Sequence, residues 1–185
     1  MEEQRTALLV MDMQLGILSR YPQAATVLGN ISKAIEYARK KEITVIYVVV
    51  GFRKGMPEVG NTNKTFSATK ERAGNADVSE MMKIHPDLAP LENDIIITKS
   101  RYSAFTGSDL DLILRSSNIQ HLVLTGIATS GVVLSTLREA SDKDYVLTVL
   151  SDACMDSDEE VHNVLTTKVF PTQADVISVE EWINL

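Results

Sequence analysis

Short apolar runs recur along the chain and alternate with segments whose apolar residues are spaced like the face of a helix. The runs are continuous rather than alternating, as expected of strands covered on both faces. They lie at residues 6–13, 43–50, 94–99, 121–126, 145–152 and 174–179. This pattern predicts six buried β-strands.

The segments between the runs carry helical signals. One apolar stripe predicts a helix over about 24–40, and it consists of Val27, Ile31, Ala34, Ile35 and Ala38. Strands that alternate with helices indicate right-handed βαβ units. We therefore predict the α/β class, a three-layer α/β/α arrangement with a six-stranded, mostly parallel sheet flanked by helices, as a single domain over residues 1–185.

Two further helix starts are indicated by capping patterns. Thr106 with Asp109 three residues later predicts a helix that continues through Leu110, Ile113 and Leu114. Asp156 with Glu159 predicts another, and its apolar stripe is Val161, Val164, Leu165 and Phe170. Each pattern places a hydroxyl or carboxylate where the first amides of a helix need an acceptor.

The segment 51–83 interrupts this alternation. It is polar, it is long for a plain connection, and it contains Gly51, Gly55, Pro57, Gly60 and Gly74. Long polar connections on a compact scaffold frequently carry function. We predict a functional loop or lid here.

Charge and composition narrow the class of partner. The formal net charge is −7 and the chain has no block of Lys or Arg, which argues against binding to nucleic acid or to an anionic membrane. No apolar run approaches the roughly 18 residues of a membrane span. We expect a soluble, cytoplasmic homo-oligomer that binds a small-molecule substrate.

Two of the predicted strands end on ionisable residues, Asp12 and Lys99. In an open parallel sheet, ligands bind at the carboxyl ends of the strands. A partly buried carboxylate and ammonium held near each other can exchange a proton with a substrate. We predict that the two side chains meet in one pocket, within about 6 Å of each other, and that Val132 lines it.

The stretch 121–140 reads as a buried strand, a tight turn and the start of a helix. In α/β enzymes such a turn often presents a nucleophile, but this one presents Val132 and Val133. Ser130 lies on the turn, where a hydroxyl most often satisfies backbone groups. Cys154, which we place after the fifth strand, is surrounded by carboxylates that raise a thiol pKa.

Three blocks of sequence resemble the signature blocks of the isochorismatase-like hydrolase family. They are "LLVMDMQ" with Asp12 and Gln14, "ITKSRYSAF" with Lys99, Ser103, Ala104 and Phe105, and "LVLTGIATSGVV" followed by "STLREA". Together they span about residues 6–180, in the family's order. The resemblance implies a six-stranded parallel sheet flanked by helices and a hydrolase activity. The family includes cysteine amidohydrolases of small amides and N-carbamoyl compounds, and isochorismatases that cleave a vinyl ether.

The resemblance also implies roles for individual residues. The amidohydrolases of the family use an Asp–Lys–Cys triad, whose first two members match Asp12 and Lys99. The cysteine position corresponds to Val132, and an isopropyl group cannot form an acyl-enzyme. The chain therefore resembles a branch without the nucleophile, like the isochorismatases, in which the Asp acts as general acid/base and water completes the cleavage. The family also has a cis peptide bond at the position of Ile127–Ala128.

From these observations we predict a candidate site. Asp12 is the general acid/base and Lys99 its electrostatic partner. Predicted substrate-binding residues come from the turn and from flanking segments: Gln14, Tyr102, Phe105, Ile127, Ala128, Ser130, Gly131 and Val132. We expect no metal, because His85, His121 and His162 show no ligand spacing, and no cofactor. A small-molecule-binding protein that has kept the pocket without the chemistry is the alternative.

Overall fold

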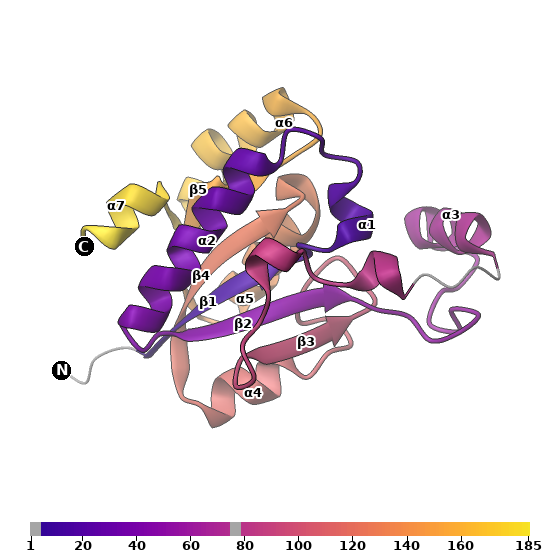
Figure 1. Ribbon diagram of the computed structural model, residues 1–185, viewed down its shortest axis with the longest axis horizontal. Helices are drawn as coiled ribbons and strands as arrows, with labels where there is room; N and C mark the ends of the chain where they lie inside the picture. Colours follow the sequence, from indigo (N-terminus) through magenta and orange to yellow (C-terminus); the bar gives the residue numbers. More distant parts are fainter. Residues whose placement is uncertain (1–4, 75–78) are drawn as a thin grey trace.

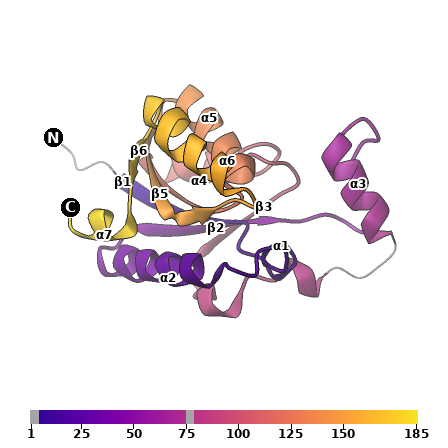
Figure 2. The ribbon, with the colours of Figure 1, turned by 90° about the horizontal axis from the view of Figure 1, so that it is seen from above.

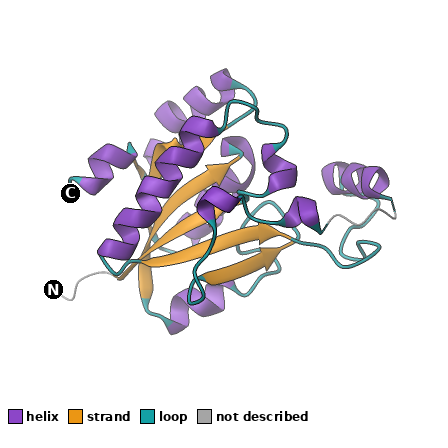
Figure 3. Cartoon of the chain, viewed as in Figure 1, coloured by secondary structure: helices purple, strands orange, loops and turns teal. Residues whose placement is uncertain are grey.

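In the computed structural model, residues 5–74 and 79–185 are described, and within them six strands form one sheet (Figure 1, Figure 3). The strand order is β3-β2-β1-β4-β5-β6 and every pairing is parallel. The strands are β1 (Arg5–Met11), β2 (Thr44–Val50), β3 (Ile95–Lys99), β4 (Ile119–Ile127), β5 (Val146–Met155) and β6 (Asp175–Ile177). Each overlaps one of the apolar runs, so the predicted strands are confirmed.

Helices cover both faces of this sheet (Figure 2). Helices α2 and α7 lie on one face, and α4, α5 and α6 lie on the other. The helices are α1 (Leu15–Leu18), α2 (Ala25–Lys40), α3 (Lys64–Ala73), α4 (Leu110–Ser116), α5 (Leu134–Asp142), α6 (Glu159–Val164) and α7 (Val179–Ile183). The predicted three-layer α/β/α arrangement is therefore correct.

Strand β1 shows why its apolar run is continuous. Leu8 and Val10 are buried in the core on the α2 side, whereas Leu9 and Met11 are buried in the core on the α4–α5 side. Successive side chains of a strand point to opposite faces, so a strand covered on both faces needs apolar residues at every position. The stripe predicted for α2 is likewise buried at all five positions.

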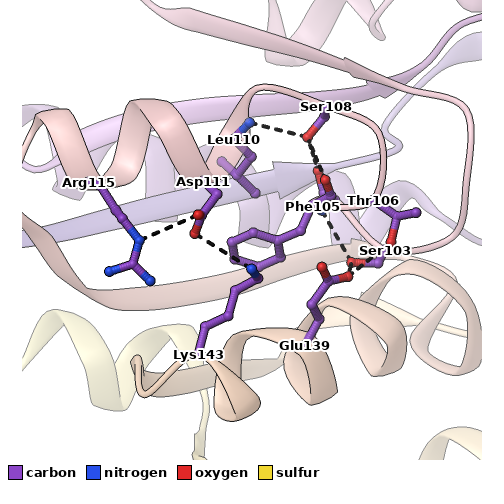
Figure 4. Close-up of polar contacts among 10 residues, drawn as sticks. Ser103, Phe105, Thr106, Ser108, Leu110, Asp111, Arg115, Glu139 and Lys143 are labelled. Carbon is purple, nitrogen blue, oxygen red and sulfur yellow. Dashed lines mark hydrogen bonds and ion pairs between the residues drawn. The ribbon is translucent and has the colours of Figure 1, made fainter.

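The two predicted capping patterns are wrong, and for one physical reason. Helix α4 begins after Asp109, whose side chain makes no capping bond, and the Thr106 hydroxyl donates instead to Glu139 (Figure 4). Helix α6 is capped by Asp158, and Asp156 accepts the backbone N–H of Ser130. In both cases a partner distant in sequence takes the side chain that local spacing assigns to the helix.

The apolar stripe predicted after Asp156 is correct only in part. Leu165 and Phe170 are buried, but Val161 and Val164 are exposed. The regular α-helix stops at Val164, and the chain continues through a π-helical turn, Leu165–Val169, and a 3₁₀ turn, Phe170–Thr172. These changes of helical pitch rotate the buried face, which a fixed period of 3.6 residues cannot follow.

Residues 51–74, called the insert below, stand apart from the sheet and carry α3 (Figure 1, Figure 2). They have a small core of their own, formed by Met56, Val59 and Phe66. The Lys70 ammonium donates to the carbonyl oxygens of Met56 and Val59, at 3.1 and 3.4 Å. The predicted loop thus contains a helix, and residues 75–78 of it lie outside the described residues.

Candidate active site

The carboxyl ends of β1 and β3 bring Asp12 and Lys99 together. Lys99 is the last residue of β3, and Asp12 follows β1, where its backbone N–H donates to the Val48 carbonyl of β2 at 2.8 Å. The Lys99 ammonium reaches across β2, and its Nζ lies 2.9 Å from Asp12 Oδ2. The predicted proximity of the two side chains is confirmed.

Burial gives this pair its electrostatic character. Lys99 is 1% exposed and Asp12 is 6% exposed. Burial raises the pKa of the Asp12 carboxyl from its usual 3.8 to about 6, and the charge and hydrogen bond of Lys99 oppose that rise. The carboxyl group can therefore take up and release a proton near neutral pH.

Lys99 has a second hydrogen-bond partner, whereas one carboxylate oxygen of Asp12 has none among the described residues. The Lys99 ammonium also donates to the carbonyl oxygen of Arg101, at 2.9 Å. Among the described residues, Asp12 Oδ1 is buried and has no hydrogen-bond partner. Leaving a buried carboxylate oxygen without a hydrogen-bond donor costs free energy. An oxygen in this state is typical of an atom that contacts a water molecule or a substrate.

The turn after β4 has an unusual backbone. The Ile127–Ala128 peptide bond is cis, as the resemblance implies, and the chain continues into a π-helical turn, Thr129–Val133, before α5. Gly126 has φ 132°, and a Cβ atom there would overlap the carbonyl oxygen of Met11. Glycine is therefore required where β4 passes β1 beside Asp12.

Several amides of this turn already have acceptors inside the protein. The Ser130 N–H donates to Asp156 Oδ2 at 2.7 Å. The amides of Gly131 and Val133 donate to the Ala128 carbonyl, at 3.0 and 3.3 Å. The backbone amides of Ser130 and Gly131, two of the residues predicted to bind substrate, thus already donate to acceptors inside the protein.

His162 and Asp156 hydrogen-bond to residues of the turn. The Thr129 hydroxyl and His162 Nδ1 share a hydrogen bond of 2.8 Å, and Asp156 holds Ser130 as described. Burial opposes ionisation of Asp156, but hydrogen bonds from Ser130 and neighbouring amides outweigh it and lower the pKa of that carboxyl group. Burial also lowers the pKa of the His162 imidazole, against the charges of Asp156 and Glu159. Sequence reasoning missed this support, although Asp156 directly follows a strand end, where sites gather.

Val132 and Cys154 are both buried side chains. Val132 is 1% exposed and belongs to the core on the α4–α5 side. Cys154 lies inside β5, opposite Gly126 of β4, so its predicted place after the strand is wrong. Burial raises the pKa of the Cys154 thiol to about 12; a hydrogen bond from the Gly126 backbone opposes this rise, and the charge of Asp152 adds a smaller increase. At neutral pH this side chain is a thiol packed in the core.

Gln14 and Phe105, both predicted to bind substrate, have internal partners. The Gln14 amide nitrogen donates to the carbonyls of Val50 and Met82, at 2.9 and 2.7 Å, and its oxygen accepts from the Val50 amide. Gln14 therefore joins β2 to the segment after the insert. Phe105 is buried, and its ring lies beside the Lys143 ammonium at the amino end of β5 (Figure 4).

The Tyr102 side chain is exposed to solvent and lies beside the turn. Its side chain is 45% exposed, and its Cδ1 lies 3.6 Å from the point that a Cβ on Gly131 would occupy. The ring centroid of Phe66 in α3 lies 5.3 Å from the ring centroid of Tyr102. Tyr102 is thus close to both the turn and the insert.

Neither a metal-binding cluster nor a membrane-spanning helix is found among the described residues. Within residues 5–74 and 79–185, no three His, Cys, Asp or Glu side chains form a group able to hold a metal ion. In the same residues, no helix is both long and apolar enough to cross a membrane.

Comparisons with known proteins identify the family. The isochorismatase domain model matches residues 6–181, so the chain belongs to the isochorismatase family. Among curated proteins, it is 30% identical to the uncharacterized isochorismatase family protein YwoC of Bacillus subtilis over 98% of this chain and 94% of that protein. It is 38% identical to the ureidoacrylate amidohydrolase RutB of Caulobacter vibrioides over 80% of this chain and 76% of that protein.

Solved structures agree with this assignment. An isochorismatase family protein from Burkholderia thailandensis superposes with a TM-score of 0.84 and 28% identity, covering 96% of this chain and 93% of that one. N-carbamoylsarcosine amidase from Thermoplasma acidophilum has a TM-score of 0.78 and 25% identity, covering 96% and 98%. The six-stranded sheet between two helix layers is therefore the fold of this family.

Proposed function

We propose that this protein hydrolyses a small molecule at the carboxyl edge of the sheet, with Asp12 as general acid/base and Lys99 as its electrostatic partner. The observation that carries the proposal is the buried pair itself, in which the pKa of Asp12 is about 6 and its Oδ1 has no hydrogen-bond partner in the described residues. A general base is most effective when its pKa lies near the working pH.

In the proposed reaction, water is the nucleophile. Asp12 Oδ1 accepts a proton from the water molecule while the water oxygen bonds to the electrophilic carbon of the substrate. The bond to the leaving group then breaks, and Asp12 returns the proton to the leaving nitrogen or oxygen atom. The Lys99 ammonium stabilises the carboxylate form of Asp12, which is present before the proton is taken up and again after it is returned.

This route needs no covalent intermediate. Val132 occupies the position that corresponds to the family cysteine, and the Cys154 thiol is buried with a raised pKa. The substrate class we propose is a small amide or carbamoyl compound, for which the steps above are written. For a vinyl ether, the other choice, the order is reversed: protonated Asp12 gives its proton to the terminal vinyl carbon, water adds to the resulting oxocarbenium carbon, and Asp12 takes a proton from that water before the alcohol leaves. RutB and N-carbamoylsarcosine amidase, whose names denote amide hydrolysis, support the first class.

The test is a screen of the purified protein against small amides, carbamoyl compounds and isochorismate. Asp12→Asn keeps the shape of the side chain and removes the ionisable group, so we expect a loss of about 10²–10⁴ in kcat. Asp94→Asn is the matched control, because Asp94 is also ion-paired, with Arg39 at 2.6 Å, but lies at the amino end of β3. Turnover that survives Asp12→Asn would refute the assignment.

A second function is favoured by one observation, the buried valine at the cysteine position. A small-molecule-binding protein of this fold would bind the screened compounds in calorimetry and turn none of them over. Val132→Cys separates the two functions: beside a working Asp12–Lys99 pair the new thiol has a lowered pKa and confers amidase activity, whereas in a binding protein it stays inert.

A further inference from the structure

In the loop after β3, Arg101 contacts both the Asp12–Lys99 pair and the insert. The backbone carbonyl of Arg101 accepts a hydrogen bond from the Lys99 ammonium at 2.9 Å. Its guanidinium Nη2 donates to the Glu58 carbonyl at 2.8 Å, and its Cζ lies 5.8 Å from the centre of the Phe66 ring. Arg101 therefore contacts the pair through its backbone and the insert through its side chain.

Neighbouring residues make the same junction. The Ser100 hydroxyl donates to the Gly51 carbonyl, where the insert begins, at 2.7 Å. The Tyr102 ring packs against Phe66. The insert has its own core and stands apart from the sheet, and these contacts join it to the loop after β3 (Figure 1).

We propose that Arg101 is a positioning residue that couples the seating of the insert to the geometry of the Asp12–Lys99 pair; its catalytic consequence rests on the proposed function. With the insert seated, the guanidinium holds residue 101 in place and its carbonyl orients the Lys99 ammonium toward Asp12. A shift of the insert would displace this carbonyl, and Lys99 would lose one of the two acceptors that it has among the described residues.

The test compares Arg101→Gln with a matched control, Arg53→Gln. Arg53 also contacts Glu58, through the carboxylate Oε1 at 2.7 Å, but both of these residues belong to the insert. Two measurements use the free protein: hydrogen exchange of residues 53–73, and titration of the Asp12 carboxyl by ¹³C NMR, assigned as the signal that Asp12→Asn removes. Neither measurement requires turnover, so a failure to find a substrate leaves the test intact.

In Arg101→Gln we expect exchange in the insert to rise about tenfold, because a charge-assisted hydrogen bond is lost. We also expect Asp12 to titrate at a higher pH, because a displaced ammonium offsets burial less well. Among the described residues, Lys99 of β3 is the charged group that shifts the pKa of Asp12. The neighbouring strands β2 and β4 approach Asp12 with backbone atoms, at Val48 and Gly126. Arg53→Gln leaves the Asp12 titration as in the wild type, and Arg101→Lys, which keeps a cation, restores part of both effects.

Two outcomes overturn the proposal. If Arg101→Gln loosens the insert while Asp12 titrates as before, the insert and the pair are not coupled. If exchange in the insert is unchanged, Arg101 does not anchor it. Where a substrate is known, coupling predicts that Arg101→Gln lowers kcat more than it raises KM, since the pair is disturbed rather than the binding surface.

Discussion

Replacing Lys99 with methionine isolates the electrostatic part of the site. Met has a similar length and suits a position that is 1% exposed, so the variant removes the ammonium with little change in packing. Asp12 then stays buried without the charge 2.9 Å away that opposes the rise of its pKa. We expect Lys99→Met to change the pH dependence of stability in a defined direction.

The magnitude follows from the pKa of Asp12, which is 3.8 in its usual state and about 6 in the folded protein. Between these values the folded state binds more protons than the unfolded state, so the free energy of unfolding falls as the pH rises. The loss is complete above about pH 6 and amounts to about 3 kcal/mol, whereas below 3.8 both states are protonated and nothing is lost.

Without Lys99 the pH range over which the free energy of unfolding falls becomes wider. An opposite charge at such a distance lowers a carboxyl pKa by about 1–3 units, so its removal raises the pKa of Asp12 further above its usual value. The free energy of unfolding of Lys99→Met should therefore continue to fall above pH 6, where the wild-type contribution of Asp12 is constant. The additional loss is about 1.4–4 kcal/mol.

Urea unfolding followed by circular dichroism, repeated at fixed pH values on both sides of neutrality, measures this difference. The double variant Lys99→Met with Asp12→Asn is the control, because it has no carboxyl group to titrate and should lack the added slope. Parallel stability curves for wild type and Lys99→Met above pH 6 would show that Lys99 does not govern the ionisation of Asp12.

Three other outcomes are expected. Cys154 should resist iodoacetamide in the native protein, because burial raises its pKa to about 12, and rapid labelling seen by mass spectrometry would contradict its place in the core. Gly126→Ala should destabilise the protein by about 3 kcal/mol, since its Cβ overlaps the Met11 carbonyl, and a thermal melt like that of the wild type would disprove the close approach. Asp156→Ala should lower the free energy of unfolding by about 1–3 kcal/mol in chemical denaturation, because it leaves the Ser130 amide without its acceptor. Asp156→Asn keeps an oxygen and should recover most of this loss, so equal losses in the two variants would argue against that hydrogen bond.

The local spacing of apolar residues was sufficient to predict the strands and helix α2. The run that becomes β1 is apolar at every position because both faces of the sheet are covered, and the α2 stripe repeats with the period of a helix. Asp12 and Lys99 were also identified from sequence, because each ends an apolar run and the carboxyl ends of parallel strands share one edge. The cis bond at Ile127–Ala128 came only from the family resemblance, since no local pattern signals it.

Side chains that bond to distant partners could not be placed in this way. Thr106 and Asp156 have the spacing of helix caps, yet they bind Glu139 and the Ser130 amide, which lie 33 and 26 residues away. Gln14 matches a family block but joins β2 to the segment after the insert, and Phe105 packs into the core. Capping spacing describes a few neighbouring residues, whereas the partner that wins is set by the path of the whole chain.

The central pair shows where the two kinds of information meet. Its residue types and strand-end positions are properties of the sequence, and so is the valine at position 132. The 2.9 Å contact across β2, the rise of the Asp12 pKa and the link through Arg101 to the insert depend on segments that are 87 and 43 residues apart along the chain. Desolvation and the distance between charges exist only once the sheet and both helix layers have assembled, so the chemistry of this site is decided by tertiary structure.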